Sequence, residues 1–545
     1  MNRVYLGLCA FLLTTASSAS TLVYNVNGYT MNAGERLSFV ALEFDQGKVT
    51  HLYQDQDQAQ KSLASERIDG EGSTLLPGLI DAHGHVSSHG RALSAVNLVG
   101  STSEADSVAR VQGFIAAYPQ REWITGRGWN QVLWSGKQFP VRDSLDKVSA
   151  DKVVALGRID GHAMWVNSRA LDLAGIDIAT PDPDGGQIIR DASGRATGVL
   201  IDNAMDLVAA VMPPVTDAQM AEYAAIAMQD LAGYGVTSVH DAGITAQEVR
   251  AFQALRRENR MITRIYAMLD VLDPANDEYL RQGPLIDPEH LLDIRSVKIS
   301  ADGALGSRGA ALFEDYSDEP GQKGLLLVNN EQLDNHMGRS MAAGYQVNIH
   351  AIGDLANARV LDYMETMINK YNNRNLRHRN EHSQIIRPQD IPRFAEIGVV
   401  ASIQPTHATS DKNMAGDRLG AKRLEGAYVW RKLLNSGAAL AGGSDFPVES
   451  ANPFFGLHAA ITRQSQDNQP PGGWMPEEKL SRDETLSLFT EWAAWSAHQE
   501  NVIGRLLPGY AADFILVRDD YFTVPEQDIW KNKVLATFVA GNKVY

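Results

Sequence analysis

Short apolar runs alternate with longer stretches of helical periodicity through the central part of the chain. Each run ends at polar residues or glycine, which is typical of buried parallel strands joined by helical crossovers. Eight such runs can be counted: Leu75 to Ile80, Val236 to Val239, Arg264 to Leu269, Ser296 to Ile299, Gln346 to Ile349, a short one before His382, Val399 to Ile403, and Ala438 to Ala441. Eight strands of this kind predict an α/β fold with a distorted (β/α)8 TIM barrel, whose working face lies at the carboxyl ends of the strands.

The two ends of the chain have a different pattern, with short alternating segments separated by turns. Turns at Asn27-Gly28 and Gln46-Gly47 divide the first part, and strand-turn-strand segments return after Gly504. We expect residues 20–73 and 500–545 to pair as one composite β-sandwich, which leaves 74–499 for the barrel.

The first two barrel runs are separated by about 155 residues, far more than one helical crossover needs. This stretch is rich in turns and contains four of the nine tryptophans. It predicts a subdomain inserted after the first barrel strand, at about 104–230.

The first residues have the pattern of a secretory signal peptide. Arg3 precedes an apolar stretch from Val4 to Leu13, and small residues follow as far as Ser20. We expect cleavage after Ala19, so that 1–19 is removed and the protein is periplasmic or secreted. A membrane anchor is the alternative, but ten apolar residues fall short of the roughly 20 needed to span a bilayer.

The charge of the chain is acidic, with 49 Lys and Arg against 66 Asp and Glu and a net charge of -17. Removing 1–19 takes away Arg3 and no acid, so 48 against 66 gives -18 for the mature chain. No long basic stripe is present, which disfavours nucleic acid as a partner. Cleavage would also remove the one cysteine, so thiolate chemistry is excluded and His, carboxylates and Lys must carry the function.

Six residues at or just past the ends of these runs have the side chains of a two-metal hydrolytic site. They are His83, His85, Lys298, His350, His382 and Asp445. The His83-Gly84-His85 sequence would place two imidazoles on one face of a strand, and four imidazoles select zinc or a similar ion rather than calcium or magnesium. The alternative for the histidines is that they are hydrogen-bonded residues of the core, and the alternative for Asp445 is a helix cap.

Lys298 lies inside a buried run, where an unpaired ammonium is costly. It could pair with a core carboxylate. We favour a lysine whose pKa is lowered by burial, and which takes up carbon dioxide as a carbamate that bridges two metal ions.

Several segments together resemble the amidohydrolase superfamily, and within it the amidohydrolase family 3 branch that includes N-substituted formamide deformylases. They are 77–85, 235–241, 298–308, 350–354, 381–382, 404–407 and 443–447. The resemblance implies a β-sandwich with a distorted barrel, zinc or a similar ion, and hydrolysis of a C–N bond. It also implies a carboxylated Lys298.

Three further residues are tentative substrate contacts. His162 matches a family segment in the insert, Arg308 follows the fourth strand, and Trp129 could line the pocket. The alternative is a structural hydrogen bond for His162, a salt bridge to a loop acid for Arg308, and a place in the insert core for Trp129.

These observations predict an exported metal-dependent amidohydrolase that acts on a small amide, with N-substituted formamides as a candidate class. Water activated by two divalent ions would attack the carbonyl, while Asp445 takes its proton and returns it to the departing nitrogen. A deaminase or cyclic-amide hydrolase and, less favoured, a non-catalytic binding protein are the alternatives. We expect no stable membrane insertion, and the chain could form a homo-oligomer.

Overall fold

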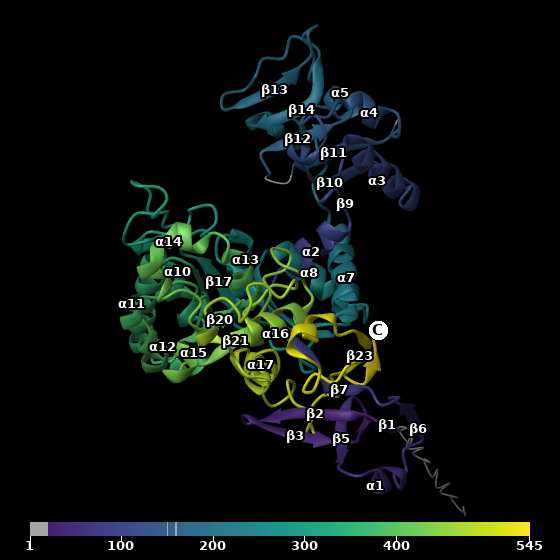
Figure 1. Ribbon diagram of the computed structural model, residues 1–545, viewed down its shortest axis with the longest axis vertical. Helices are drawn as coiled ribbons and strands as arrows, with labels where there is room; N and C mark the ends of the chain where they lie inside the picture. Colours follow the sequence, from purple (N-terminus) through teal and green to yellow (C-terminus); the bar gives the residue numbers. More distant parts are fainter. Residues whose placement is uncertain (1–19, 150, 159–160) are drawn as a thin grey trace, which may run out of the picture.

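The computed structural model describes residues 20–149, 151–158 and 161–545. The predicted signal peptide at 1–19 lies outside these residues. Three parts follow one another along the long axis of the molecule (Figure 1): two sheets built from the chain termini, a central barrel, and a separate sheet formed by the insert. Within the described residues, no helix is long and apolar enough to cross a membrane.

The central barrel contains eight strands in one parallel sheet, as the apolar runs predict. In sheet order they are β21 (Leu440–Gly442), β20 (Val400–Ile403), β19 (Arg379–His382), β18 (Gln346–Ala351), β17 (Leu292–Ser300), β16 (Arg264–Asp270), β15 (Val236–Ile244) and β8 (Leu79–Gly84). The ends of this sheet meet where Asp445 N donates to His83 O at 2.7 Å and His85 N donates to Phe446 O at 2.9 Å. The barrel is therefore nearly closed beside the candidate ligands.

Helices cover the outside of the barrel. They are α2 (Val86–Leu93), α7 (Asp217–Gly233), α8 (Ala246–Arg257), α9 (Asp277–Gln282), α10 (Asn330–Ala342), α11 (Asp354–Tyr371), α12 (Ile391–Ile397), α13 (Pro405–Asp411), α14 (Ala415–Leu424), α15 (Trp430–Asn435), α16 (Pro453–Thr462), α17 (Arg482–Leu488) and α18 (Glu491–Ser496). Capping boxes begin α7 at Thr216 and α8 at Thr245, where side chain and backbone satisfy each other's hydrogen bonds.

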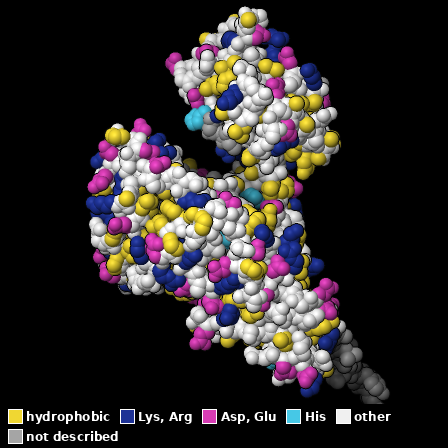
Figure 2. Space-filling view, viewed as in Figure 1, with side chains coloured by type: hydrophobic (Ala, Val, Ile, Leu, Met, Phe, Trp, Pro, Cys, Tyr) yellow, Lys and Arg dark blue, Asp and Glu magenta, His cyan; other side chains and the backbone are white. Residues whose placement is uncertain are grey.

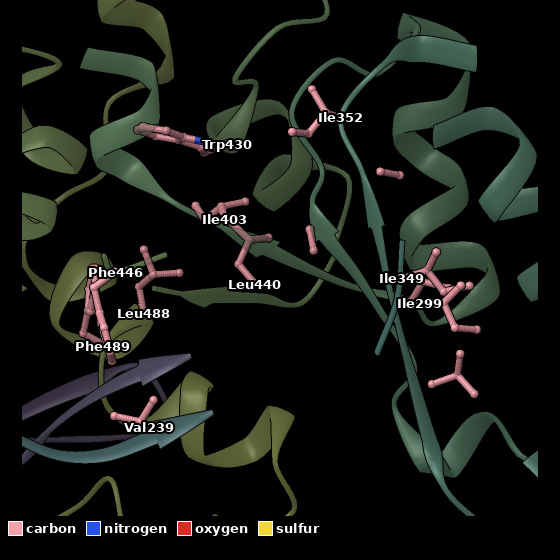
Figure 3. Close-up of a cluster of buried hydrophobic side chains, with 14 of the residues drawn as sticks. Val239, Ile299, Ile349, Ile352, Ile403, Trp430, Leu440, Phe446, Leu488 and Phe489 are labelled. Carbon is pink, nitrogen blue, oxygen red and sulfur yellow. The ribbon is translucent and has the colours of Figure 1, made fainter. Parts of the chain in front are cut away.

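One large apolar core joins the barrel strands to these helices. Figure 3 shows Ile299 and Ile349, on neighbouring strands, close together. Phe446, Leu488 and Phe489 form another group in the same view, and all these side chains are essentially buried. Burial of apolar surface on this scale is the main source of stability for a barrel of this size.

Both termini contribute to the sheets below the barrel. A six-stranded sheet has the order β24 (Asn542–Lys543), β23 (Val534–Val539), β22 (Phe514–Val517), β7 (Thr74–Pro77), β2 (Asn27–Asn32) and β3 (Glu35–Phe39). A four-stranded sheet has the order β5 (Lys48–Tyr53), β4 (Ala41–Asp45), β1 (Thr21–Tyr24) and β6 (Glu66–Asp69), with α1 (Gln56–Gln60) beside it. One apolar cluster contains residues from both sheets, among them Phe44 and Phe514.

The structure differs from the expected first barrel strand, Leu75 to Ile80. β7 pairs with β22 in the terminal sheet, and only β8, beginning at Leu79, pairs with β15 of the barrel. The break falls at Gly78, where a Cβ atom would lie 2.2 Å from Thr237 Oγ1. This close approach of two strands requires glycine.

The insert forms its own mixed sheet between β8 and β15. In sheet order its strands are β13 (Gly186–Arg190), β14 (Ala196–Asp202), β12 (Ala163–Val166), β11 (Val153–Arg158), β10 (Trp123–Trp129) and β9 (Val96–Asn97). Its helices are α3 (Glu104–Ala117), α4 (Arg142–Asp146), α5 (Ser168–Leu173) and α6 (Asp206–Ala209). The insert has separate apolar clusters and stands apart from the barrel beyond β9 and α7 (Figure 1).

Candidate metal centre

His83 occupies the end of the first barrel strand and is fully buried. Its Nδ1 donates to Glu381 Oε2 at 2.5 Å, so its Nε2 is left to face the barrel mouth. There Nε2 lies 3.1 Å from Lys298 Nζ and 3.7 Å from Asp445 Oδ1. A carboxylate behind an imidazole is the arrangement that orients metal-binding histidines.

Asp445 follows the last barrel strand on a tightly held loop. Its backbone has a φ of +63°, a region that non-glycine residues rarely adopt, and its Oδ1 accepts from His85 Nε2 at 3.1 Å. The preceding Ser444 donates from both N and Oγ to the buried Asp81 carboxylate. A Cβ on Gly443 would lie 2.5 Å from His83 N, so this glycine lets the loop approach the first strand.

Two groups of possible ligand atoms meet at Asp445. The first donor group contains His83, His85 and Asp445, and the second contains His382, His407 and Asp445. Within each group the ligand atoms lie within 4.8 Å of one another. Asp445 is therefore a member of both donor groups.

His407 was not among the residues predicted as ligands from the sequence. It lies in α13, just past strand β20, and its Nε2 is 3.6 Å from Asp445 Oδ2. Its position after a strand end was the available signal. The ring is parallel to that of His382 at a centroid distance of 5.9 Å.

His350 lies at the side of the second donor group. Its ring is 4.4 Å from that of His382, but its Nε2 faces Asp302 Oδ1 at 3.5 Å. The structure thus brings His350 next to His382 without including it in either donor group. Burial raises the pKa of Asp302 to about 7, although three backbone N–H groups, from Ala311, Ile352 and Gly353, donate to its carboxylate.

Lys298 extends from β17 into the same space and is 8% exposed. Burial lowers its pKa, and within the described residues it has no carboxylate at ion-pair distance. It borders a cavity of about 250 Å3 together with His85 and Asp270.

The candidate ligands carry the charges that metal binding requires. Burial, followed by the charge of Lys298, lowers the pKa of His83 to about 4, so the imidazole is neutral at neutral pH. Burial would raise the pKa of Asp445, but the hydrogen bond from His85 holds it well below its usual range. Neutral imidazoles beside an ionised carboxylate form a donor set for zinc or a similar ion.

One buried nitrogen atom of the second donor group bears on whether an ion fits. Within the described residues, His407 Nε2 has no hydrogen-bond partner, and it lies 3.6 Å from Asp445 Oδ2. Buried polar atoms are normally satisfied, so an unpartnered nitrogen beside a carboxylate is in keeping with a ligand position. The donor set therefore fits a metal centre.

The three residues predicted as substrate contacts each have a partner within the protein. Trp129 is buried in the insert core and donates from Nε1 to Leu156 O at 2.8 Å. His162 is exposed on the insert, and its Nδ1 lies 2.8 Å from Asp202 Oδ1. Arg308 pairs with Asp318 at 3.0 Å, which favours the salt-bridge interpretation.

Comparison with known proteins places this geometry among hydrolases. A sequence model described as "Amidohydrolase family" matches residues 66–545. The putative amidohydrolase YtcJ of Bacillus subtilis is 32% identical over 524 residues, covering 95% of this chain and 98% of that protein. The N-substituted formamide deformylase of Arthrobacter pascens is 25% identical over 500 residues, covering 88% of this chain and 89% of that protein.

A solved structure supports the same assignment. An uncharacterized metal-dependent hydrolase from Pyrococcus furiosus superposes with a TM-score of 0.76 and 27% sequence identity, over 93% of this chain and all of the other.

Proposed function

This chain belongs to the amidohydrolase family and is a metal-dependent hydrolase acting on C–N bonds other than peptide bonds. On that premise we propose that it cleaves a small amide, with N-substituted formamides as the first class to test. The observation that supports this most directly is the meeting of two donor groups on one carboxylate, Asp445, at the carboxyl ends of the barrel strands.

Each donor group would hold one divalent ion, and zinc fits the imidazole and carboxylate donors. When bound, such ions lower the pKa of a water molecule toward 7 and polarise a carbonyl oxygen. His83 and His382 come from strands on different sides of Asp445, so the two donor groups lie side by side at the carboxyl ends of the strands.

Asp445 is the proposed base. Its carboxylate is held at one oxygen by His85 and approached at the other by His407, so it has a fixed direction toward the centre. It would take the proton of the attacking water and return it to the departing nitrogen, which must leave as a neutral amine.

Lys298 is proposed to carry a carbamate. Its burial, its lowered pKa and the lack of a carboxylate partner among the described residues favour the neutral amine that reacts with carbon dioxide. Reaction of the amine with carbon dioxide forms an N–C bond and releases one proton, leaving a carboxylate near His83. Growth with 13C-bicarbonate should produce a carbamate carbon signal that is lost in Lys298→Met.

The first experiment compares turnover before and after chelation. Metal-loaded enzyme is offered N-formyl amines, N-acyl amines and cyclic amides, and amine release is measured. We expect hydrolysis of at least one class, its loss on chelation and its return with zinc. Turnover that survives complete metal removal would contradict the proposal.

Asp445→Asn tests the base. We expect this variant to lower kcat by about 10²- to 10⁴-fold, because a neutral amide cannot accept the proton. Metal content, measured by elemental analysis, should fall less than activity. Asp318→Asn, on the loop that pairs with Arg308, is the control and should retain most of the turnover. Wild-type kcat in Asp445→Asn would remove this residue as the base.

A further inference from the structure

Strand β19 places two oppositely charged residues inside the barrel, directly behind the candidate ligands. Arg379 and Glu381 are two positions apart on this strand, so both point to the same face, and both are fully buried. Arg379 Nε lies 2.7 Å from Glu381 Oε1. The proposed proton transfers use neither residue directly.

Glu381 uses its two carboxylate oxygens for different partners. Oε2 accepts from His83 Nδ1 at 2.5 Å and from Arg379 Nη2 at 3.1 Å, whereas Oε1 faces Arg379 Nε. With Nδ1 bearing the proton, His83 must present the lone pair of Nε2 to the first donor group. The hydrogen bond therefore selects the tautomer that can bind an ion.

Arg379 is itself fixed by three further acceptors from three other strands. Its guanidinium donates to Ala82 O at 2.6 Å, to His240 Nδ1 at 2.8 Å and to Ser402 Oγ at 3.0 Å. These contacts join β8, β15 and β20 to β19 below the barrel mouth. Since Ala82 directly precedes His83, Arg379 holds both the backbone and, through Glu381, the ring of this histidine.

We propose that Arg379 and Glu381 form a positioning pair that sets the tautomer and direction of His83 and thereby the affinity of the first donor group for its ion. The inference rests on the metal centre of the proposed function and is independent of which amide is cleaved. An ordinary buried ion pair would instead contribute to stability alone. The chain contains such a pair: Arg264 Nε and Asp513 Oδ2, 2.6 Å apart and almost fully buried.

Glu381→Gln is the informative substitution. An amide has one acceptor oxygen where the carboxylate has two, so glutamine must leave either His83 Nδ1 or Arg379 facing an N–H group. Asp513→Asn is the matched control, because it makes the same chemical change in the Arg264 pair. Should Glu381→Gln not fold, Glu381→Asp keeps the charge but shortens the reach toward His83.

The measurement is zinc affinity by competition with a chelator, together with thermal unfolding of the metal-free proteins and the visible absorption of the cobalt-loaded forms. We expect Glu381→Gln to bind zinc about 10- to 100-fold more weakly and to alter the cobalt spectrum. Asp513→Asn should lower the unfolding temperature without changing zinc affinity or the cobalt spectrum.

The possible failures are distinguishable. A folded Glu381 variant with wild-type zinc affinity and an unchanged cobalt spectrum would overturn the positioning role while leaving the hydrolase proposal intact. Equal weakening in Asp513→Asn would also overturn it, because the effect would then be general to buried pairs. A wild-type protein that binds no zinc or cobalt would remove the metal centre and this inference with it.

Discussion

A buried imidazole can form a hydrogen bond to the protein through one ring nitrogen while the other nitrogen binds a ligand. In His382, neighbouring residues determine which nitrogen has which partner. Its Nδ1 donates to Gln404 Oε1 at 2.9 Å, and its backbone is held at a φ of +74°. Strained backbone of this kind persists where the surrounding structure fixes it, often at functional sites. His382 and Asp445 both have this feature, and they belong to the same donor group.

In His378 the Nδ1 atom accepts a hydrogen bond instead of donating one, and from this we predict that pH affects stability. Its Nδ1 accepts from Val347 N at 2.9 Å, and burial lowers its pKa to about 3. The unfolded chain binds a proton near pH 6.5 that the folded chain does not, so stability is complete above that pH and falls as the pH decreases toward 3. The slope for one such histidine is about 1.4 kcal/mol per pH unit.

His378→Asn keeps an acceptor for Val347 N but cannot take up a proton. Urea unfolding at pH 7, 6 and 5 should therefore show a shallower loss of unfolding free energy in this variant than in the wild type. His51→Asn, at an exposed position on β5, is the control and should leave the slope unchanged. An identical slope in His378→Asn would show that this histidine does not contribute.

At the scale of elements, the candidate ligands lie together because the barrel strands end on one face. The insert has an apolar core of its own, separate from that of the barrel. The ligands come from β8, β17, β18, β19 and the segments after β20 and β21, all on the face where parallel strands end. The insert instead packs Trp129 and Trp165 in an apolar cluster of its own. Its tryptophans therefore stabilise the insert, and none of the described contacts of Trp129 reaches the donor groups.

Trp165→Ala should unfold the insert without disturbing the metal centre. Trp165 is fully buried, and truncation of such a side chain costs about 3–5 kcal/mol. We expect proteolytic cleavage within 96–202 at lower temperature than in the wild type, with zinc affinity unchanged. Leu173→Ala, at a half-exposed position on α5, should have little effect. Equal loss of zinc affinity and insert stability would contradict this independence.

The whole molecule is held together by contacts that cross between its parts. Arg264 of β16 binds Asp513 beside β22, and Thr537 Oγ1 of β23 donates to Ala232 O of α7 at 2.7 Å. These contacts attach the sheet of the C-terminal segment to the barrel. On the face shown in Figure 2, Lys and Arg are interspersed with Asp and Glu rather than gathered in one stripe.

We propose that the protein is exported, because residues 1–19 have the composition of a signal peptide. Expressed with its own leader in a Gram-negative host, the chain should be found in the periplasmic fraction with an intact mass that begins at Ser20. A chain that starts at Ser20 behind an initiator methionine should stay in the cytoplasm. Full-length protein retained in the cytoplasm would refute export.

The sequence by itself determined the number and order of the barrel strands, and it predicted four of the residues that the structure places in the two donor groups. Local patterns suffice for this, because a buried strand must be apolar and a polar residue at its end is visible along the chain. His83, His85, His382 and Asp445 are all of this kind. The break at Gly78 was missed, because it depends on the approach of Thr237 from the next strand.

Only the tertiary structure decided which of these residues contact one another. In the structure His407 belongs to the second donor group, whereas His350 lies beside that group. Glu381 and Arg379 lie behind His83. Such choices depend on distances between strands far apart in sequence and on which ring nitrogen faces which neighbour. Periodicity along the chain has no information on either, because both are set by how the barrel closes.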